Sequence, residues 1–357
     1  MRIFLFGEYS GLHSNLRLGF KKLGHETLLL SSGDGHKQIF GDIQCGNNFK
    51  IKFFRNLFRA LQFWLILPKI RNYDIVQFIS YEFLVMPDIL KVLYLKLLKY
   101  SNKKVIINRC GVDAIGIYRF LGNLRYSPLQ NELKEGHFDS ISKQIGYDKL
   151  KISFRLTSMF DGIIVNTYEY YIAHNQLNNF TGSIPLPIKL NAIFKPNVII
   201  NRIKILYGVL REDRKGHRYI QTALEDIRNR HSDAVEVIIV RDLPLQEYEL
   251  LLEECNILID QACSYSIGMN ALYALSKGKV VLGGNEPEAN TFFDFDVPVV
   301  NILPCSEDII EKIEYFIKNI NKIPEVGKLG YEYASTKHNA DKIADQYIKY
   351  YKNIINA

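Results

Sequence analysis

Three acidic side chains in the second half of the chain follow apolar runs, and their placement suits the binding of phosphate. Asp260 ends one run, and Glu286 and Glu288 come just after the glycine pair Gly283-Gly284 that ends the next. The carboxyl ends of neighbouring parallel strands meet at one edge of a sheet, where a helix N-terminus also offers free N–H groups. The spacing therefore predicts a site for a phosphate-bearing ligand at this edge.

A helix is expected between these two apolar runs, over Met269–Ser276, because the stretch is rich in Ala, Leu and Met. Gly278 comes just after it, where helices commonly end in a left-handed residue. Gly268 and Met269 would then stand at the helix N-terminus and face the ligand. An ordinary helix-to-strand turn is the alternative interpretation.

A second charged group follows the apolar strand expected at Lys204–Tyr207. Gly208 begins it, and Arg211 and Lys215 carry the positive charge. Two phosphates require cations and N–H donors together, and the same groups stabilise the charge of a departing diphosphate. We predict that Gly208, Arg211 and Lys215 bind a diphosphate. A solvated charge cluster is the alternative.

Two places in the first half carry polar residues just after apolar runs and could bind a ligand. Gly11 closes a glycine-bracketed loop after the first apolar run, and His13 follows it. Arg109 and Asp113 come at the end of a buried strand, and residues 119–150 are expected to form an irregular acceptor-side loop. A plain helix-entry histidine and a simple turn of the chain are the respective alternatives for His13 and for the Arg109–Asp113 pair.

Apolar runs and helical patterns alternate along most of the chain, as in parallel α/β sheets. The chain begins with a Rossmann-like unit of a strand over Arg2–Phe6, a helix over Asn15–Leu23 and a strand over Thr27–Leu30. Its loop lacks the G-x-G-x-x-G spacing, so the nicotinamide fingerprint is absent. Further strands are expected at residues 74–79, 104–108, 161–165, 204–207, 235–240, 256–260 and 280–282.

The second half resembles the donor domain of retaining GT-B glycosyltransferases of the GT4-like group. The resemblance implies an α/β, GT-B fold in which two Rossmann-like domains face each other across a cleft. It also implies transfer of a sugar from a nucleotide diphosphate donor to an acceptor hydroxyl. Lys215 aligns with a family lysine on the diphosphate, whereas Val209 occupies the place of the family arginine, so that Arg211 must serve instead. The residues that carry the donor-domain match are Gly268, Ala274, Gly278-Lys279, Val280-Val281, Gly283-Gly284 and Pro287-Glu288.

The chain departs from the family at two glutamates that are separated by seven residues, the first of which contacts the donor sugar and the second the ribose. Tyr265 and Tyr273 stand at these positions. We therefore predict that Glu288, together with Glu286 and Asp260, makes the donor contacts. The two tyrosines would act as neutral hydrogen-bond partners or ring platforms, since carboxylates form the stronger hydrogen bonds.

The resemblance also covers the glycine loop at Gly11 and His13, which it implies lies near the acceptor and the donor phosphates. It further covers the strand end at Asp113 and the connection between the domains. The family often presents a His or Asp toward the sugar at this strand end, so that Asp113 is the candidate catalytic group, with Arg109 beside it. The sequence Ile184-Pro185-Leu186-Pro187-Ile188 resembles the family linker and places the boundary near Leu190. We expect an acceptor domain over residues 1–190, a donor domain over 191–337, and a terminal helix over 338–357 that returns to the first domain.

The composition fits two globular domains: 357 residues, 47% of them hydrophobic, with a formal net charge of +7. The five cysteines form no C-x-x-C pair, which favours a reducing cytoplasm. The first strand begins directly after Met1, so no export signal is expected, and no window is apolar enough to predict a membrane-spanning helix. The chain is expected to be cytoplasmic.

Residues 50–71 combine basic and aromatic side chains in one amphipathic segment. Such a helix can lie in a membrane interface with its cations on anionic head groups. A helix packed on the sheet with cations at its rim is the alternative. The first interpretation would place the protein on the inner face of the plasma membrane.

We therefore expect a glycosyltransferase of cell-surface polysaccharide synthesis, such as that of lipopolysaccharide or capsule. The acceptor would be a saccharide or a lipid-linked intermediate, and the reaction would be retaining and free of bound metal, because Arg211 and Lys215 replace the cation. No cofactor besides the nucleotide-sugar substrate is expected, and no nucleic acid. With both glutamates replaced, a catalytically silent sugar-binding or partner module and a nucleotide-sugar isomerase are the alternatives.

Overall fold

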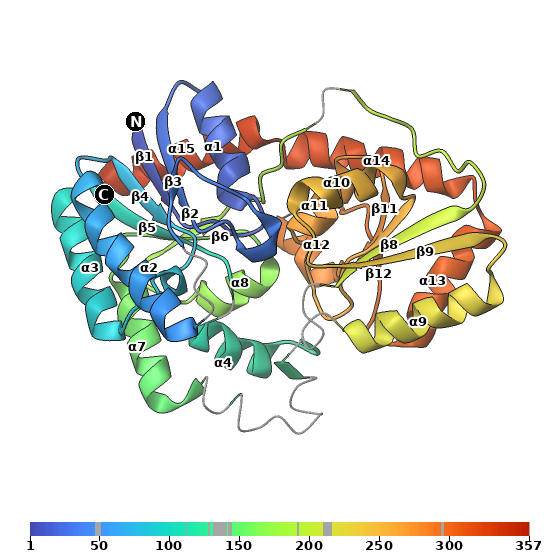
Figure 1. Ribbon diagram of the computed structural model, residues 1–357, viewed down its shortest axis with the longest axis horizontal. Helices are drawn as coiled ribbons and strands as arrows, with labels where there is room; N and C mark the ends of the chain where they lie inside the picture. Colours follow the sequence, from blue (N-terminus) through green and yellow to red (C-terminus); the bar gives the residue numbers. More distant parts are fainter. Residues whose placement is uncertain are drawn as a thin grey trace.

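Two parallel β-sheets, each flanked by helices, form the two halves of the molecule in the computed structural model (Figure 1). The first sheet is built from the first half of the chain and the second sheet from the second half. The structure describes residues 1–46, 51–111, 113–127, 129–130, 141, 145–190, 193–209, 216–293 and 296–356.

The first sheet has the strand order β3-β2-β1-β4-β5-β6-β7, and every neighbouring pair is parallel. Its strands are β1 (Arg2–Phe6), β2 (Glu26–Ser31), β3 (Ile43–Gln44), β4 (Ile75–Phe78), β5 (Lys104–Arg109), β6 (Ile163–Val165) and β7 (Phe180–Ser183). The helices of this half are α1 (Leu12–Lys22), α2 (Lys52–Ile66), α3 (Asp88–Ser101), α4 (Ala114–Asn123), α7 (Tyr147–Ser158) and α8 (Tyr168–His174), with the 3-10 turns η1 (Gly35–Lys37), η2 (Leu67–Lys69) and η3 (Tyr81–Phe83).

The second sheet has the order β12-β11-β10-β8-β9, again with parallel neighbours. Its strands are β8 (Ile203–Val209), β9 (Val235–Arg241), β10 (Ile257–Ile259), β11 (Val280–Gly283) and β12 (Val300–Asn301). The helices are α9 (His217–Arg230), α10 (Leu245–Glu254), α11 (Met269–Leu275), α12 (Pro287–Phe293), α13 (Ser306–Lys318), α14 (Lys322–Lys337) and α15 (Ala340–Asn356). The boundary predicted near Leu190 falls in the connection between β7 and β8.

The strands are apolar on both faces because helices cover both faces of each sheet. In β1, Phe4 and Phe6 pack into the core beneath α2 and α3, whereas Ile3 and Leu5 pack toward α1 and α15. A strand that is buried on both faces is stabilised by apolar residues at every position, whereas a strand with one solvent-exposed face is stabilised by apolar residues at alternate positions. This is the reason that continuous apolar runs located the strands in the sequence.

The last helix, α15, returns from the second half and packs against α1 of the first (Figure 1). Gly19 permits this close contact: a Cβ atom at Gly19 would lie 2.3 Å from the carbonyl oxygen of Ala340. A buried hydrogen-bond chain joins the same elements, since the Tyr351 hydroxyl donates to Gln77 Oε1 and the Gln77 amide donates to His13 Nε2. The two halves are therefore connected at the linker and again through α15.

Both sheets have a topological switch point, which is where open parallel sheets bind ligands. It lies between β1 and β4 in the first sheet and between β8 and β10 in the second. The loops that follow these strands face each other across the space between the two halves (Figure 1). A site shared by both halves is expected there.

The expectation of an irregular loop over residues 119–150 is corrected by the structure at both ends. Helix α4 extends as far as Asn123 and α7 begins at Tyr147, so the ends of this region are helical. The segment after Gly283-Gly284 continues into helix α12. Within the described residues, no helix has the length and apolar character needed to cross a bilayer.

Candidate functional site

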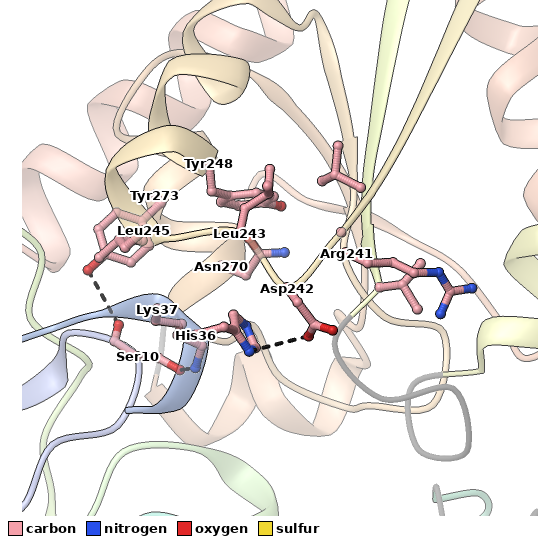
Figure 2. Close-up of a pocket in the computed structure, with 13 residues that line it drawn as sticks. Ser10, His36, Lys37, Arg241, Asp242, Leu243, Leu245, Tyr248, Asn270 and Tyr273 are labelled. Atoms are coloured by element: carbon pink, nitrogen blue, oxygen red, sulfur yellow. Dashed lines mark hydrogen bonds and ion pairs between the residues drawn. The ribbon is translucent and has the colours of Figure 1, made fainter. Parts of the chain in front are cut away.

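A cavity of about 560 Å³ lies between the two halves, at the carboxyl ends of β8 and β9 (Figure 2). The first half lines it from the loops that follow β1 and β2, and the second half from β8, β9, α10 and α11. The lining residues are Ser10, His36, Lys37, Gly208, Val209, Val240, Arg241, Asp242, Leu243, Leu245, Tyr248, Asn270 and Tyr273.

One wall of the cavity is apolar and comes from the second half. Val209 and Val240 end two neighbouring strands, and the ring of Tyr248 from α10 lies beside them. Gly208 allows this arrangement, because a Cβ atom there would come within 3.0 Å of the Tyr248 ring. A flat apolar wall of this kind suits the face of an aromatic base.

The opposite rim is polar and comes from the first half. The Lys37 ammonium donates to Ser10 Oγ at 2.7 Å and to Asp34 at 2.8 Å, while the Asp34 carboxylate also accepts the Ser10 backbone N–H at 2.7 Å. His36 Nδ1 lies 3.3 Å from Asp242 Oδ1, so an ion pair forms across the cavity when the imidazole is protonated (Figure 2). The rim can offer a cation to an anionic ligand.

Backbone strain is concentrated at this rim. Of the five described non-glycine residues with positive φ, four border the cavity or its loops: Ser10 at 55°, Asp34 at 51°, Gln38 at 53° and Asp242 at 50°. Such left-handed conformations cost free energy for residues with a side chain and cluster at functional sites. This observation supports the cavity independently of its shape.

Tyr273 connects the two halves at the cavity. Its hydroxyl donates to the Ser10 carbonyl at 3.3 Å and accepts from Asn15 Nδ2 at 3.3 Å, and burial raises its pKa. Gly11 makes room for it: a Cβ atom at Gly11 would lie 2.1 Å from the Tyr273 oxygen, and the Gly11 φ of 84° would strain any other residue. Of the two tyrosines that replace the family glutamates, this one borders the cavity.

Asp260 does not line the cavity itself but binds Asn270, which does. It lies buried at the end of β10 and accepts a 2.8 Å hydrogen bond from Asn270 Nδ2, and Asn270 itself lines the cavity. Gly268 is the extended N-cap residue of α11, and Met269 is buried in the core. The structure therefore brings Gly208, Tyr273 and, through Asn270, Asp260 together.

Glu286 and Glu288 bind an arginine of the first half instead of bordering this cavity. Arg125, located after α4, forms ion pairs with both carboxylates, and its hydrogen bond lowers the pKa of Glu288. Glu286 also accepts from the Tyr126 hydroxyl and from Asn301 Nδ2. The prediction that the two glutamates contact the donor stays a prediction.

Tyr265 belongs to the same contact between the halves. Its hydroxyl accepts the Arg125 backbone N–H at 2.7 Å, and its ring stacks on Tyr168 at 5.8 Å between centroids. Beside it, the Glu169 carboxylate accepts from Ser264 Oγ at 2.7 Å and from the Tyr265 N–H at 2.8 Å. The loop 261–268 is thus held against α8 of the first half.

Arg109 and Asp113 form a buried ion pair at 2.6 Å under the ring of Tyr81, whose hydroxyl also donates to Asp113. The second carboxylate oxygen accepts the Gly116 N–H and caps α4. Burial works to raise the pKa of Asp113, but the Arg109 guanidinium holds it below its usual value. Arg109 Nε donates to His174 Nε2, and the pKa of His174 is lowered to about 4 by burial and by this guanidinium. Neither Arg109 nor Asp113 lines the cavity.

His13 is completely buried. Its Nδ1 donates to the Gly7 carbonyl at 2.7 Å and its Nε2 accepts from Gln77, which assigns the neutral tautomer. Burial lowers its pKa to about 4. Its contacts are therefore those of the helix-entry alternative. Arg211 and Lys215 lie outside the described residues.

The sequence interpretation missed Lys37, Asp242, Asn270 and Arg125. Two of them had a usable signal, because Lys37 lies in the loop that follows β2 and Asp242 comes directly after β9, both at the ligand edge. Arg125 had none, since its partners are 161 and 163 residues away in sequence.

No protein-family model and no curated protein matches the chain. Solved structures do match along its length. HepE from Anabaena, solved in complex with UDP-glucose, has a TM-score of 0.64 at 12% identity and covers 99% of this chain and 100% of its own. Sucrose-phosphate synthase from Thermosynechococcus elongatus has a TM-score of 0.63 at 13% identity, with 100% of both chains covered.

A glycosyltransferase from Rickettsia africae matches with a TM-score of 0.58 at 15% identity and covers 99% of this chain and 98% of its own. These neighbours have the GT-B fold, and both sheets of the present chain are parallel α/β layers facing a shared space. The GT-B fold expected from the sequence is therefore confirmed.

Proposed function

We propose that the protein is a glycosyltransferase that moves a sugar from a nucleoside diphosphate donor to an acceptor hydroxyl. The observation that carries the proposal is the cavity of about 560 Å³, which has an apolar wall from the second half and a polar, strained rim from the first. A nucleoside diphosphate has the same division between an aromatic base and a charged diphosphate. The cavity also lies at the carboxyl end of β8, one of the two strands that border the switch point of the second sheet, and parallel sheets bind nucleotides at this edge.

Different lining residues would bind the base and the diphosphate of the donor. The base would lie against Val209, Val240 and the ring of Tyr248. The diphosphate would lie toward the Lys37 ammonium, which offers a charge-assisted hydrogen bond from the opposite half. Arg211 and Lys215, which lie outside the described residues, keep their predicted role on the same diphosphate.

The neighbouring structures support a nucleotide sugar as the donor. HepE was solved with UDP-glucose and also with UDP and glucose. At 12% identity the likeness to HepE carries over the fold alone, so the base and the sugar of the present chain must come from binding experiments.

The finer features of the reaction are part of the proposal. Retention and independence of metal follow from the GT4-like resemblance. A saccharide or lipid-linked acceptor and a role in cell-surface polysaccharide synthesis follow from the same resemblance. A place at the inner face of the plasma membrane is supported by the exposed apolar residues of α2, such as Phe53 and Leu65. Glu288 and Asp113 remain the candidates from sequence for a direct role in catalysis.

One observation favours a second candidate, a catalytically silent GT-B module or an isomerase acting on a nucleotide sugar. Tyrosines replace both family glutamates, and the nearby Glu286 and Glu288 are bound to Arg125. A silent module would bind the donor in the same cavity without transferring its sugar. The two candidates therefore differ in turnover and not in binding.

The experiment has two stages. Thermal unfolding is first followed with UDP, GDP, ADP and their glucose, galactose and N-acetylglucosamine conjugates, because a ligand that binds the native state at 100 times its dissociation constant stabilises it by about 2.7 kcal/mol. The protein is then given the nucleotide sugar that stabilises it most, with the sugar labelled. Hydrolysis, transfer and isomerisation of that sugar are measured. Stabilisation with slow hydrolysis or transfer supports the glycosyltransferase. Binding without turnover supports the silent module, and absence of binding to every nucleotide contradicts both.

A further inference from the structure

Helix α2 exposes a row of large apolar side chains. Phe53, Leu57, Leu61 and Leu65 are spaced four residues apart and have exposed fractions of 69%, 49%, 53% and 75%. Residues at this spacing lie along one side of a helix. Phe54 widens the row. Soluble monomers rarely expose apolar residues in such numbers together, whereas interaction surfaces do.

Helix α3, which packs beside α2, repeats the pattern. Its exposed apolar residues include Ile89, Leu93 and Leu97, again four apart, and they are followed by Tyr100. The two helices are joined by Tyr94, whose ring meets that of Trp64 at 5.4 Å and whose hydroxyl donates to the Phe63 carbonyl. Figure 1 shows the pair on the outer side of the first half.

This two-helix surface is mostly basic, and the one acid in the sequence of its two helices is Asp88, the first residue of α3. Residues 51–71 contain no Asp or Glu, and neither do residues 89–104. The acids near its margin are paired with lysines: Asp74 with Lys103, and Glu82 and Asp88 with Lys91. The basic residues of the two segments are Lys52, Arg55, Arg59, Lys69, Arg71, Lys91, Lys96, Lys99, Lys103 and Lys104.

We propose that α2 and α3 form a docking surface for an anionic lipid bilayer. Exposed apolar rows flanked by cations match the acyl boundary and the negative head groups of such a membrane. A second copy of the chain fits less well. In a two-fold symmetric dimer the surface of one copy would pack against the same surface of the other. Basic residues would then lie opposite basic residues, which is electrostatically unfavourable. The proposal rests on the proposed function only for its purpose, which is to bring a lipid-linked acceptor to the cleft.

The surface is connected to the cavity by a short series of contacts. The Arg59 guanidinium of α2 lies 4.4 Å from the centre of the Phe83 ring, and that ring meets Tyr9 at 6.5 Å. Tyr9 directly precedes Ser10, which lines the cavity. A lipid-anchored acceptor that approaches along α2 would therefore arrive at the loop that carries the polar rim.

Flotation with vesicles tests the proposal. We expect the full chain to float with vesicles of 70% phosphatidylcholine and 30% phosphatidylglycerol and not with pure phosphatidylcholine. The variant Leu57→Ser, Leu61→Ser, Leu65→Ser should lose at least about tenfold in partition coefficient, since each leucine gives up buried apolar area. The matched control is Leu250→Ser, Leu303→Ser, Leu329→Ser, whose leucines are exposed in the second half and should leave partition unchanged.

A charge variant, Lys69→Glu, Arg71→Glu, Lys96→Glu, should also reduce flotation and leave the apolar row intact. The proposal is overturned if wild type does not float, if both variants float like wild type, or if sedimentation shows a dimer that the leucine variant abolishes. Thermal stabilisation by UDP, GDP, ADP and their sugar conjugates is measured on every variant. Flotation without any nucleotide binding refutes the proposed function and keeps the docking surface, whereas nucleotide binding without flotation does the reverse.

Discussion

The cavity between the two halves and the Arg109–Asp113 cluster both collect charged side chains at the carboxyl ends of parallel strands, yet they differ in access. In the cluster every partner is protein: Asp113 is shared by Arg109, Tyr81 and the N-terminus of α4, and all of it is buried. At the cavity, Lys37 and Asn270 border about 560 Å³ of open space.

The difference shows that residue type and strand-end position do not define a site by themselves. A buried carboxylate whose oxygens are all occupied stabilises the fold, and it reaches a ligand only if the structure opens. Groups at a cavity rim can exchange a protein partner for a ligand at small cost. Of the five described non-glycine residues with positive φ, Ser10 and Asp242 line the cavity and Asp34 and Gln38 lie in the loop beside it, whereas the cluster contains none.

The largest effect is expected in the cluster. Asp113→Ala leaves the Arg109 guanidinium buried without its partner and should lower the free energy of unfolding by about 3–5 kcal/mol. Urea unfolding followed by circular dichroism measures it. If stability is unchanged and sugar transfer is lost, Asp113 is catalytic, as the family resemblance implies. The distinction between a structural cluster and a ligand-binding cavity would then be wrong.

A pH effect is expected in the loop that carries the cavity rim. Burial raises the pKa of Glu8 to about 7, above its ordinary value of 4.5. The folded protein then holds a proton that the unfolded chain has released, so the contribution of Glu8 to stability is full below pH 4.5 and is lost as the pH rises to about 7. The free energy of unfolding of Glu8→Gln, measured relative to that of wild type, should therefore rise by on the order of 3 kcal/mol between pH 4.5 and pH 7.5. A constant difference between the two proteins across this range would contradict the assignment.

The cavity itself is tested by Lys37→Met. Loss of the ammonium should weaken UDP binding, measured by titration calorimetry, by at least about tenfold, because a hydrogen bond to a charged group contributes about 1.5–3 kcal/mol. Stability should change little. Lys21→Met on α1 is the matched control, since this lysine pairs with Asp42 at 3.8 Å and does not line the cavity. Equal affinity in both variants would remove Lys37 from the site.

The smallest effect concerns the contact at Arg125. If Glu288 also binds the donor, Glu288→Gln should slow transfer by about tenfold, equivalent to about 1.4 kcal/mol of barrier. Arg125→Met should slow it less than about fivefold, because an ion pair with a half-exposed arginine contributes at most about 1 kcal/mol. Equal losses in the two variants would show that Glu288 acts only through Arg125.

Much of the fold could be predicted from the sequence. Continuous apolar runs located β1, β5, β8 and β11 because these strands are buried on both faces. Gly278 was expected to be left-handed and has a φ of 69°. The candidate site was less predictable: Gly208 and Tyr273 line the cavity, whereas His13, Arg109 and Asp113 are engaged within the first half.

The sequence by itself determined the elements, the order of alternating strands and helices, and the edge at which a ligand should bind, because these follow from local periodicity and from the handedness of parallel connections. Only the tertiary structure decided which polar groups reach the ligand. Arg125 pairs with Glu286, 161 residues away, and Lys37 of the first half lines the same cavity as Gly208 of the second, and both arrangements depend on how the two halves pack. Spacing along the chain carries no information about such contacts, since they are made by side chains that only the folded chain brings together.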